Sequence, residues 1–131
     1  MAGKRRSNTP RPTDAELAIL TVLWSRGPST VRDVHDELSQ SQDTGYTTVL
    51  KLLQIMGEKG LVTRVSPTRP HVYRATAEAG VKRRLVADLL DKVFDGSAMN
   101  LVMQALSARP ASRDELRQLR ELLDGMEGDR S

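Results

Sequence analysis

The chain has 131 residues and no cysteine, so its length suits one domain with an appendage, and disulfides and thiolate metal sites are excluded. No stretch approaches the roughly 20 apolar residues of a membrane span, and no apolar run follows the N-terminal cations as in a signal peptide. We therefore expect a cytoplasmic protein without membrane insertion. The net charge of +3 lies wholly in residues 1–80, which carry 11 Lys and Arg against 8 Asp and Glu, and clustered cations suggest a polyanionic partner.

The N-terminal part of the chain is punctuated by helix-capping signals. Residues 1–12 are basic and polar and contain proline, which predicts a flexible basic arm. The first helix is expected to begin at a capping box formed by Thr13 and Glu16 and to end at a Gly-Pro pair. A second helix is expected after Thr30 and Asp33, because these residues repeat the capping pattern.

A third helix and a hairpin follow. The third helix is predicted over residues 46–59 and ends at Gly60. Residues 61–65 and 71–75 are rich in β-branched side chains and are joined by a turn with two prolines, which predicts a short hairpin with a projecting tip. Three short helices followed by a hairpin is the element order of a winged helix-turn-helix, so we expect a winged helix domain over residues 13–76 of a mainly α protein.

The C-terminal part is predicted to be helical from Glu78 onward, with further helices after Ser97 and Ser112. Its apolar stripes are too large for three short helices to bury alone, and pairing with a second copy would cover them. We therefore expect a helical dimerisation domain over residues 77–127 and a homodimer. The residues expected to pair two chains are Val81, Leu85, Leu89, Phe94, Leu101, Leu116, Leu119 and Leu123.

The third helix has a face suited to DNA. At about 100° per residue, its apolar residues share one face, and Thr47, Lys51 and Gln54 fall on the opposite face with Thr48 at its margin. No acid occurs between residues 44 and 57, and hydroxyl, amide and ammonium groups are the types that reach bases and phosphates in a major groove. The candidate DNA-binding residues are Tyr46, Thr47, Thr48, Lys51, Gln54, Arg64 and Arg69, the last two from the hairpin.

The sequence offers little support for catalysis. His35 and His71 are the only histidines, lie far apart and have no cysteine beside them, so structural or surface roles are expected. No nucleophile elbow, dinucleotide-binding glycine motif or phosphate-binding loop is present. We therefore predict no enzyme activity, no cofactor and no metal site.

Several separated motifs resemble one family in the same order. The run from Tyr46 to Leu53, continuing through Glu58 to Val62, looks like the recognition helix and wing entry of the penicillinase-repressor (BlaI/MecI/CopY) family. The similarity covers residues 13–126. Supporting stretches are Thr13–Leu17, Leu23-Trp24, Thr30–His35, Arg69–Arg74, Leu89–Phe94 and Gly96-Ser97.

The resemblance implies a homodimer that sits on a dyad operator and blocks transcription, often at TACA/TGTA half-sites. By position, it implies that Thr47, Thr48 and Lys51 face the major groove. It also implies that Arg64 and Arg69 make the contacts of the wing.

The resemblance further implies a route to derepression. Family members that govern antibiotic resistance are cleaved in the dimerisation region after a membrane-bound sensor protease detects a β-lactam, so such a protease, acting in trans, is a candidate partner. The matching candidate cleavage residues are Gln104 and Ala105, where resistance repressors carry Asn-Phe, which leaves the β-lactam link open. Copper-responsive relatives use a C-terminal cysteine cluster, and the lack of cysteine excludes that mechanism here.

Two other functions are compatible with a winged helix. The third helix could dock a protein partner, although its lack of acids and the basic hairpin favour DNA. The chain could also be a nonspecific architectural DNA binder, which would show affinity without sequence preference.

Overall fold

The computed structural model describes residues 11–130, so residues 1–10 of the predicted basic arm lie outside the described residues. The chain divides into two compact units, of which the first ends at Ala87 and the second begins at Asp88. This division falls inside a helix, whereas the predicted domain boundary after residue 76 lies in the loop before that helix.

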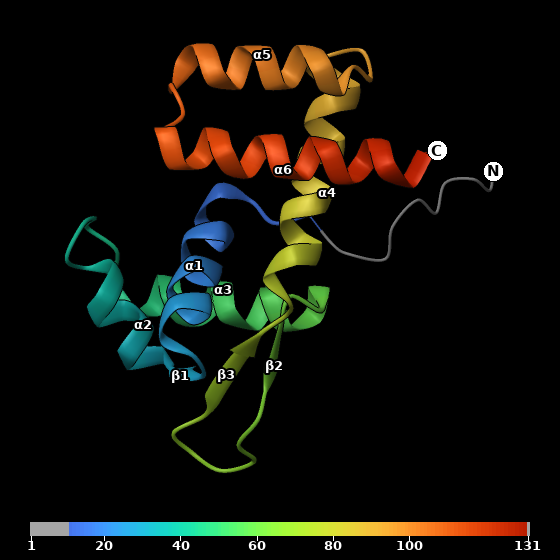
Figure 1. Cartoon of the computed structure of the whole chain (residues 1–131). Helices are drawn as coiled ribbons and strands as arrows, with labels where there is room; N and C mark the ends of the chain where they lie inside the picture. The colour runs from blue at the N-terminus through green and yellow to red at the C-terminus, as the bar shows by residue number, and fades with distance from the viewer. Residues whose placement is uncertain (1–10, 131) are drawn as a thin grey trace. The chain divides into compact units, whose positions relative to one another are not determined.

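Three helices open the first unit, and capping boxes start two of them (Figure 1). Helix α1 (Asp14–Arg26) begins where the Glu16 amide donates to Thr13 Oγ1 at 3.2 Å and the Thr13 amide donates to Glu16 Oε1 at 2.9 Å. Helix α2 (Val31–Leu38) begins with the same reciprocal pair between Thr30 and Asp33. Both predicted capping boxes are therefore confirmed, because this geometry depends only on residues three apart.

Helix α3 (Tyr46–Lys59) ends at Gly60, whose φ of 83° is in the left-handed region that glycine enters at little cost. The Leu61 amide donates to the Met56 carbonyl at 2.9 Å, which closes the helix end and turns the chain directly into a strand.

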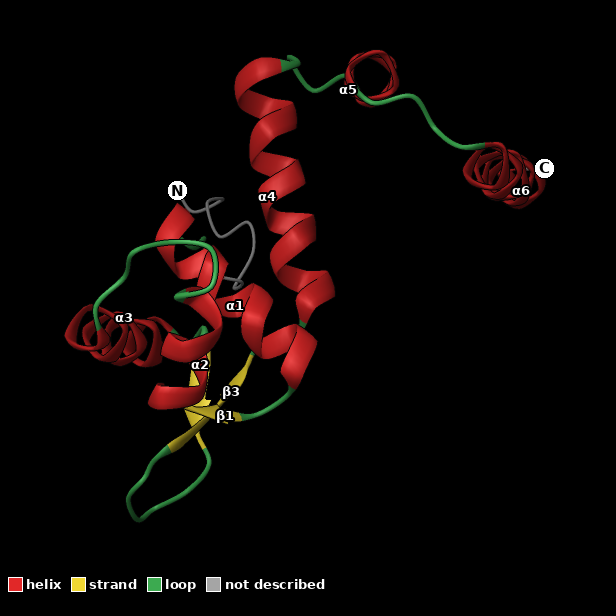
Figure 2. Cartoon of the chain, turned by 90° about the vertical axis from the view of Figure 1, so that its left-hand side faces the viewer, coloured by secondary structure: helices red, strands yellow, loops and turns green. Residues whose placement is uncertain are grey.

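A small antiparallel sheet of β1 (Ser29–Thr30), β2 (Val62–Arg64) and β3 (Val72–Ala75) has the strand order β1-β3-β2. The loop between β2 and β3 extends away from the helices, as Figures 1 and 2 show. Strand β1 was not predicted, since two residues are too few to show a periodicity and its pairing with β3 joins distant parts of the chain. With its third strand, this is the winged helix-turn-helix arrangement predicted from the sequence.

The first unit has a closed apolar core. It includes fully buried side chains from all three helices, such as Ile19, Val34 and Leu53. The indole N–H of Trp24 donates to the Thr76 carbonyl at 2.8 Å and ties α1 to the end of β3. Because this core is complete within one chain, the winged helix does not need a partner to bury its apolar residues.

The second unit contains the end of helix α4 (Glu78–Val93), helix α5 (Ala98–Ala108) and helix α6 (Arg113–Arg130). Helices α5 and α6 run in opposite directions (Figure 1). Ser97 caps α5, and a third predicted capping box, between Ser112 and Glu115, is present at α6. No side chain between residues 88 and 129 is buried, so this unit has no apolar core of its own within one chain.

Candidate nucleic-acid interface

Helix α3 presents two different faces. Val49, Leu53 and Met56 are fully buried against the rest of the first unit. The predicted DNA-facing residues Thr47, Thr48, Lys51 and Gln54 are all exposed. The only acid of the helix, Glu58, comes seven residues after Lys51 and so shares its side. The first twelve residues of the helix are therefore free of carboxylates.

A groove lies between α3 and the hairpin. Tyr46, Leu50 and Gln54, spaced four residues apart on α3, line one wall, and Arg64 and Arg69 line the other. The lining is completed by Thr30, Val31, Arg32, Pro70, His71 and Tyr73. Four of the predicted DNA-binding residues therefore meet in one groove, while the other three lie on the exposed face of α3 outside it.

The register of the hairpin decides which of its arginines face this groove. Arg64 pairs with Tyr73 across the ladder, so the two side chains share a face of the sheet, and both line the groove. Arg74 follows Tyr73 directly and therefore points to the opposite face, where it pairs with Thr63.

One basic residue at the groove was not predicted. Arg32, in the first turn of α2, lies with its guanidinium carbon 5.9 Å from the centroid of the Tyr46 ring. The ring of His35 meets the same tyrosine edge-on at 5.9 Å and 68°. Nothing in the local sequence signals this cluster, because it brings together residues of two different helices.

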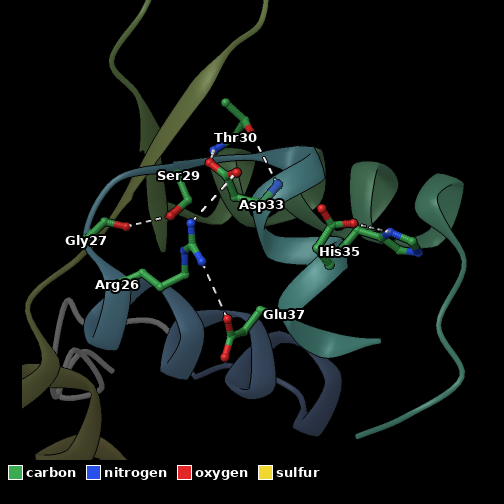
Figure 3. Close-up of polar contacts among 8 residues, drawn as sticks. Arg26, Gly27, Ser29, Thr30, Asp33, His35 and Glu37 are labelled. Atoms are coloured by element: carbon green, nitrogen blue, oxygen red, sulfur yellow. Dashed lines mark hydrogen bonds and ion pairs between the residues drawn. The ribbon is translucent and has the colours of Figure 1, made fainter. Parts of the chain in front are cut away.

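The basic side chains at the interface have no acidic partner among the described residues. Lys51, Arg32, Arg64 and Arg69 form no ion pair with an acid of residues 11–130. By contrast, Arg26 lies 3.8 Å from Asp33 and 3.5 Å from Glu37 (Figure 3). The cations of the interface are thus left available for an external anion.

The Arg26 contacts hold α2 in place behind the interface. The Thr30 amide donates to Asp33 Oδ2, and the Asp33 amide donates to Thr30 Oγ1. Hydrogen bonding with Thr30, together with the nearby charge of Arg26, holds the pKa of the Asp33 carboxyl below its ordinary value. Ser29 adds a hydrogen bond to the Gly27 carbonyl at 2.8 Å (Figure 3). Polar contacts before and after the first residue of α2 therefore stabilise the turn that leads from α1 into α2.

An ion pair with a buried carboxylate anchors the far end of α3. Lys59 Nζ lies 2.7 Å from Glu16 Oε1 and 3.0 Å from Oε2, and the glutamate is only 2% exposed. Burial opposes ionisation of Glu16, but hydrogen bonds from Lys59 and Thr13 and the charge of Lys59 outweigh it, so the pKa of Glu16 is lowered. The pair fixes the end of α3 to the start of α1.

The histidines show no arrangement for metal binding. His35 Nδ1 lies 3.6 Å from Asp36, and His71 Nδ1 lies 3.3 Å from the Ser66 carbonyl. Within residues 11–130, no three His, Asp or Glu side chains are grouped as a metal site would require.

Over the same residues, no helix is both long and apolar enough to cross a bilayer.

The residues predicted to pair two chains separate into two groups. Val81 is fully buried in the core of the first unit, and Leu85 packs against that core. The others lie in the second unit, half-buried or exposed: Leu89, Phe94, Leu101, Leu116, Leu119 and Leu123. The candidate cleavage residues Gln104 and Ala105 are exposed near the middle of α5.

Comparison with known proteins places this arrangement in a family. The chain matches the penicillinase repressor family over residues 12–125, nearly its whole length. The chain belongs to the penicillinase repressor family. This is a family of transcriptional repressors, which are not enzymes.

Individual members of the family cover the chain to different extents. The transcriptional regulator BlaI of Mycobacterium tuberculosis (strain ATCC 25618 / H37Rv) is 42% identical over 78 residues, which are 59% of this chain and 54% of the relative. The chain thus spans about half the length of that relative. The methicillin resistance regulatory protein MecI of Staphylococcus aureus (strain N315) is 21% identical over 86% of this chain and 92% of its own.

Among solved structures, the monomeric form of Bacillus licheniformis BlaI in complex with the blaP half-operator is 26% identical to this chain. The match covers 54% of this chain and 88% of that chain, with a TM-score of 0.48.

Proposed function

We propose that this chain is a cytoplasmic, sequence-specific transcriptional repressor that binds a two-fold symmetric operator as a homodimer. The observation that carries the proposal is the exposed, acid-free face of α3 beside a groove lined by arginines without acidic partners. A polyanion with readable base edges fits such a surface, since cations bind phosphates and hydroxyl, amide and ammonium groups read bases.

The proposed DNA-binding residues fall into two groups, those that contact bases and those that contact phosphates. Thr47, Lys51 and Gln54 project from the exposed side of α3, which enters the major groove and places them at base edges. Arg64 and Arg69 belong to the wing, where a guanidinium meets the phosphates that flank the groove.

The second unit supports pairing of two copies. Val93, Met99 and Leu123 are 64%, 67% and 59% exposed within one chain. A further apolar groove between α5 and α6 includes Leu106 and Leu119 in its lining. A second copy that covers these side chains removes them from water and generates a two-fold axis, which matches the symmetry of a dyad operator.

Proteolysis in the dimerisation region would reverse repression. Gln104 and Ala105 are exposed, but their peptide bond lies within α5, so cleavage needs local unwinding of the helix. A membrane-bound sensor protease acting in trans is the proposed agent. Separating the winged helices would remove the gain in affinity that two linked half-site contacts provide.

The test is DNA binding to the promoter region of the chain's own gene, compared with a duplex of unrelated sequence. Lys51→Ala and Thr47→Ala should relax sequence preference, each by about 1–3 kcal/mol at a contacted base pair. Arg69→Ala should weaken binding to both duplexes alike and lower the salt slope by about one unit.

Other outcomes would assign a different function. Equal wild-type affinity for both duplexes would identify a nonspecific architectural binder. Absence of binding to either duplex would leave the winged helix as a protein-interaction module. An Arg69→Ala variant with altered preference, beside a Lys51→Ala variant that behaves as wild type, would contradict the assigned roles.

A further inference from the structure

Tyr46 and Arg32 form a contact that the general roles of helix and wing do not explain. Tyr46 is the first residue of α3 and is 44% exposed. A tyrosine at such a position is free to turn the face of its ring to solvent or to a base. Instead, the guanidinium of Arg32 lies over the ring at 5.9 Å, within the range of a cation–π contact.

Helix α2 holds this ring from two positions. Arg32 and His35 are three residues apart and therefore share a side of α2. The edge-to-face contact of His35 fixes the plane of the Tyr46 ring, and the ring in turn gives Arg32 a defined place to rest. An arginine on an open surface would otherwise spread over many rotamers.

The charge of Arg32 is not neutralised within the described part of the chain. No acid of residues 11–130 lies within ion-pair distance of it. The neighbouring Asp33 is engaged by Thr30 and Arg26, and Asp36 lies against His35. Across the groove lie Arg64 and Arg69, so three guanidinium groups surround one groove.

We propose that Arg32 binds a DNA backbone phosphate at the groove between α3 and the wing, and that Tyr46 is the positioning residue that holds the guanidinium there. This inference rests on the proposed function, since it names a further contact of the same interface. It assigns Tyr46 to phosphate binding through Arg32 and leaves base reading to Thr47, Lys51 and Gln54.

The salt dependence of DNA binding tests the proposal, because each phosphate contact contributes about 0.9 to the slope of log affinity against log salt. With the full chain and a short duplex of arbitrary sequence, Arg32→Ala should lower the magnitude of that slope by about 0.9, the contribution of one phosphate contact. Tyr46→Leu should lower it similarly, and Tyr46→Phe, which keeps the ring, should restore the wild-type slope. The double variant Arg32→Ala/Tyr46→Leu should fall no further than Arg32→Ala alone.

Arg74→Ala is the matched control, because it removes the same charge from the opposite face of the hairpin and should leave the slope near the wild-type value. Thermal unfolding of each variant shows whether the winged helix stays folded.

The proposal is overturned if Arg32→Ala keeps the wild-type slope or if Arg74→Ala lowers it equally. It is also overturned if Tyr46→Leu changes sequence preference but not the slope, since Tyr46 would then read bases. Loss of all DNA binding by the wild type would instead overturn the proposed function itself.

Discussion

Leucine side chains meet very different surroundings in the two compact units. In the first unit, Leu20, Leu53 and Leu61 are completely buried among helices and strands of the same chain. In the second unit, Leu122 and Leu123 are more than half exposed, and no side chain between residues 88 and 129 is buried. Both units are helical and both carry regular apolar stripes, so the difference lies in what covers those stripes.

The two units should differ in the source of their stability. The first unit gains its free energy of folding from contacts within one chain and can hold α3, the proposed recognition helix, in a fixed place. The second unit leaves apolar area in water, and each large side chain that becomes covered gains about 1.5–3 kcal/mol. Its stability should therefore depend on the concentration of a second copy.

Removing most of the second unit should have the largest effect on DNA binding. A chain that ends at Gln104 retains every core residue of the first unit but loses the last four residues of α5 and all of α6. It should sediment as a monomer and bind its operator about 10²–10⁴-fold more weakly, since the linked second contact is lost. Equal operator affinity for the truncated and full chains in a gel shift would reject both dimerisation and the derepression route.

A matched pair of leucine substitutions tests the contrast directly. Leu53→Ala removes a fully buried side chain and should lower the free energy of unfolding of the winged helix by about 2–5 kcal/mol. Leu123→Ala makes the same chemical change at an exposed position and should leave that unfolding transition unchanged. Denaturant titration followed by Trp24 fluorescence reports on the first unit, where this tryptophan lies. Similar losses in both variants would mean that the two units do not differ as described.

Leu123→Ala should instead weaken the association of two chains. If the partner covers this side chain, dissociation should become easier by up to about 1.5–3 kcal/mol for each leucine uncovered. Sedimentation equilibrium over a range of protein concentrations measures the shift. Glu121→Ala, at an exposed position of α6 outside the groove between α5 and α6, is a suitable comparison for the loss of side-chain atoms alone. A dissociation constant that stays at the wild-type value would place Leu123 outside the interface.

The ion pair between Lys59 and the buried Glu16 should give a smaller effect that depends on pH. Lys59→Met keeps the aliphatic stem but leaves Glu16 buried without its cation, and it should cost about 1–3 kcal/mol at neutral pH. This is below the cost for a fully buried pair, because Lys59 keeps 36% of its side chain exposed. Lys82→Met, which breaks only the surface pair with Glu78, should change stability by less than about 0.5 kcal/mol.

The sign of the pH effect follows from the lowered pKa of Glu16. In the wild type, its contribution to stability is present above the unfolded pKa and is lost as the pH falls through the folded pKa. In Lys59→Met, burial dominates and the folded pKa rises, so the stability gap between variant and wild type should narrow as the medium becomes acidic. A gap that is constant across this range would show that Glu16 and Lys59 do not act as an ion pair.

Much of the fold was predictable because its signals are local. Thr13 with Glu16, and Thr30 with Asp33, start helices through hydrogen bonds between residues three apart, and Gly60 ends α3 because it tolerates a positive φ. The spacing of Val49, Leu53 and Met56 likewise predicted which side of α3 would be buried, and therefore that Thr47 and Lys51 would be exposed.

Tertiary structure alone decided the features that join distant residues. The apolar stripe of α4 predicted that Val81 would be covered, but only packing decided that the winged helix covers it. The Glu16–Lys59 pair, the short strand β1 and the contact between Arg32 and Tyr46 leave no periodic or capping signal. A helix period specifies a face and a cap specifies an end, and neither specifies which distant surface will meet that face.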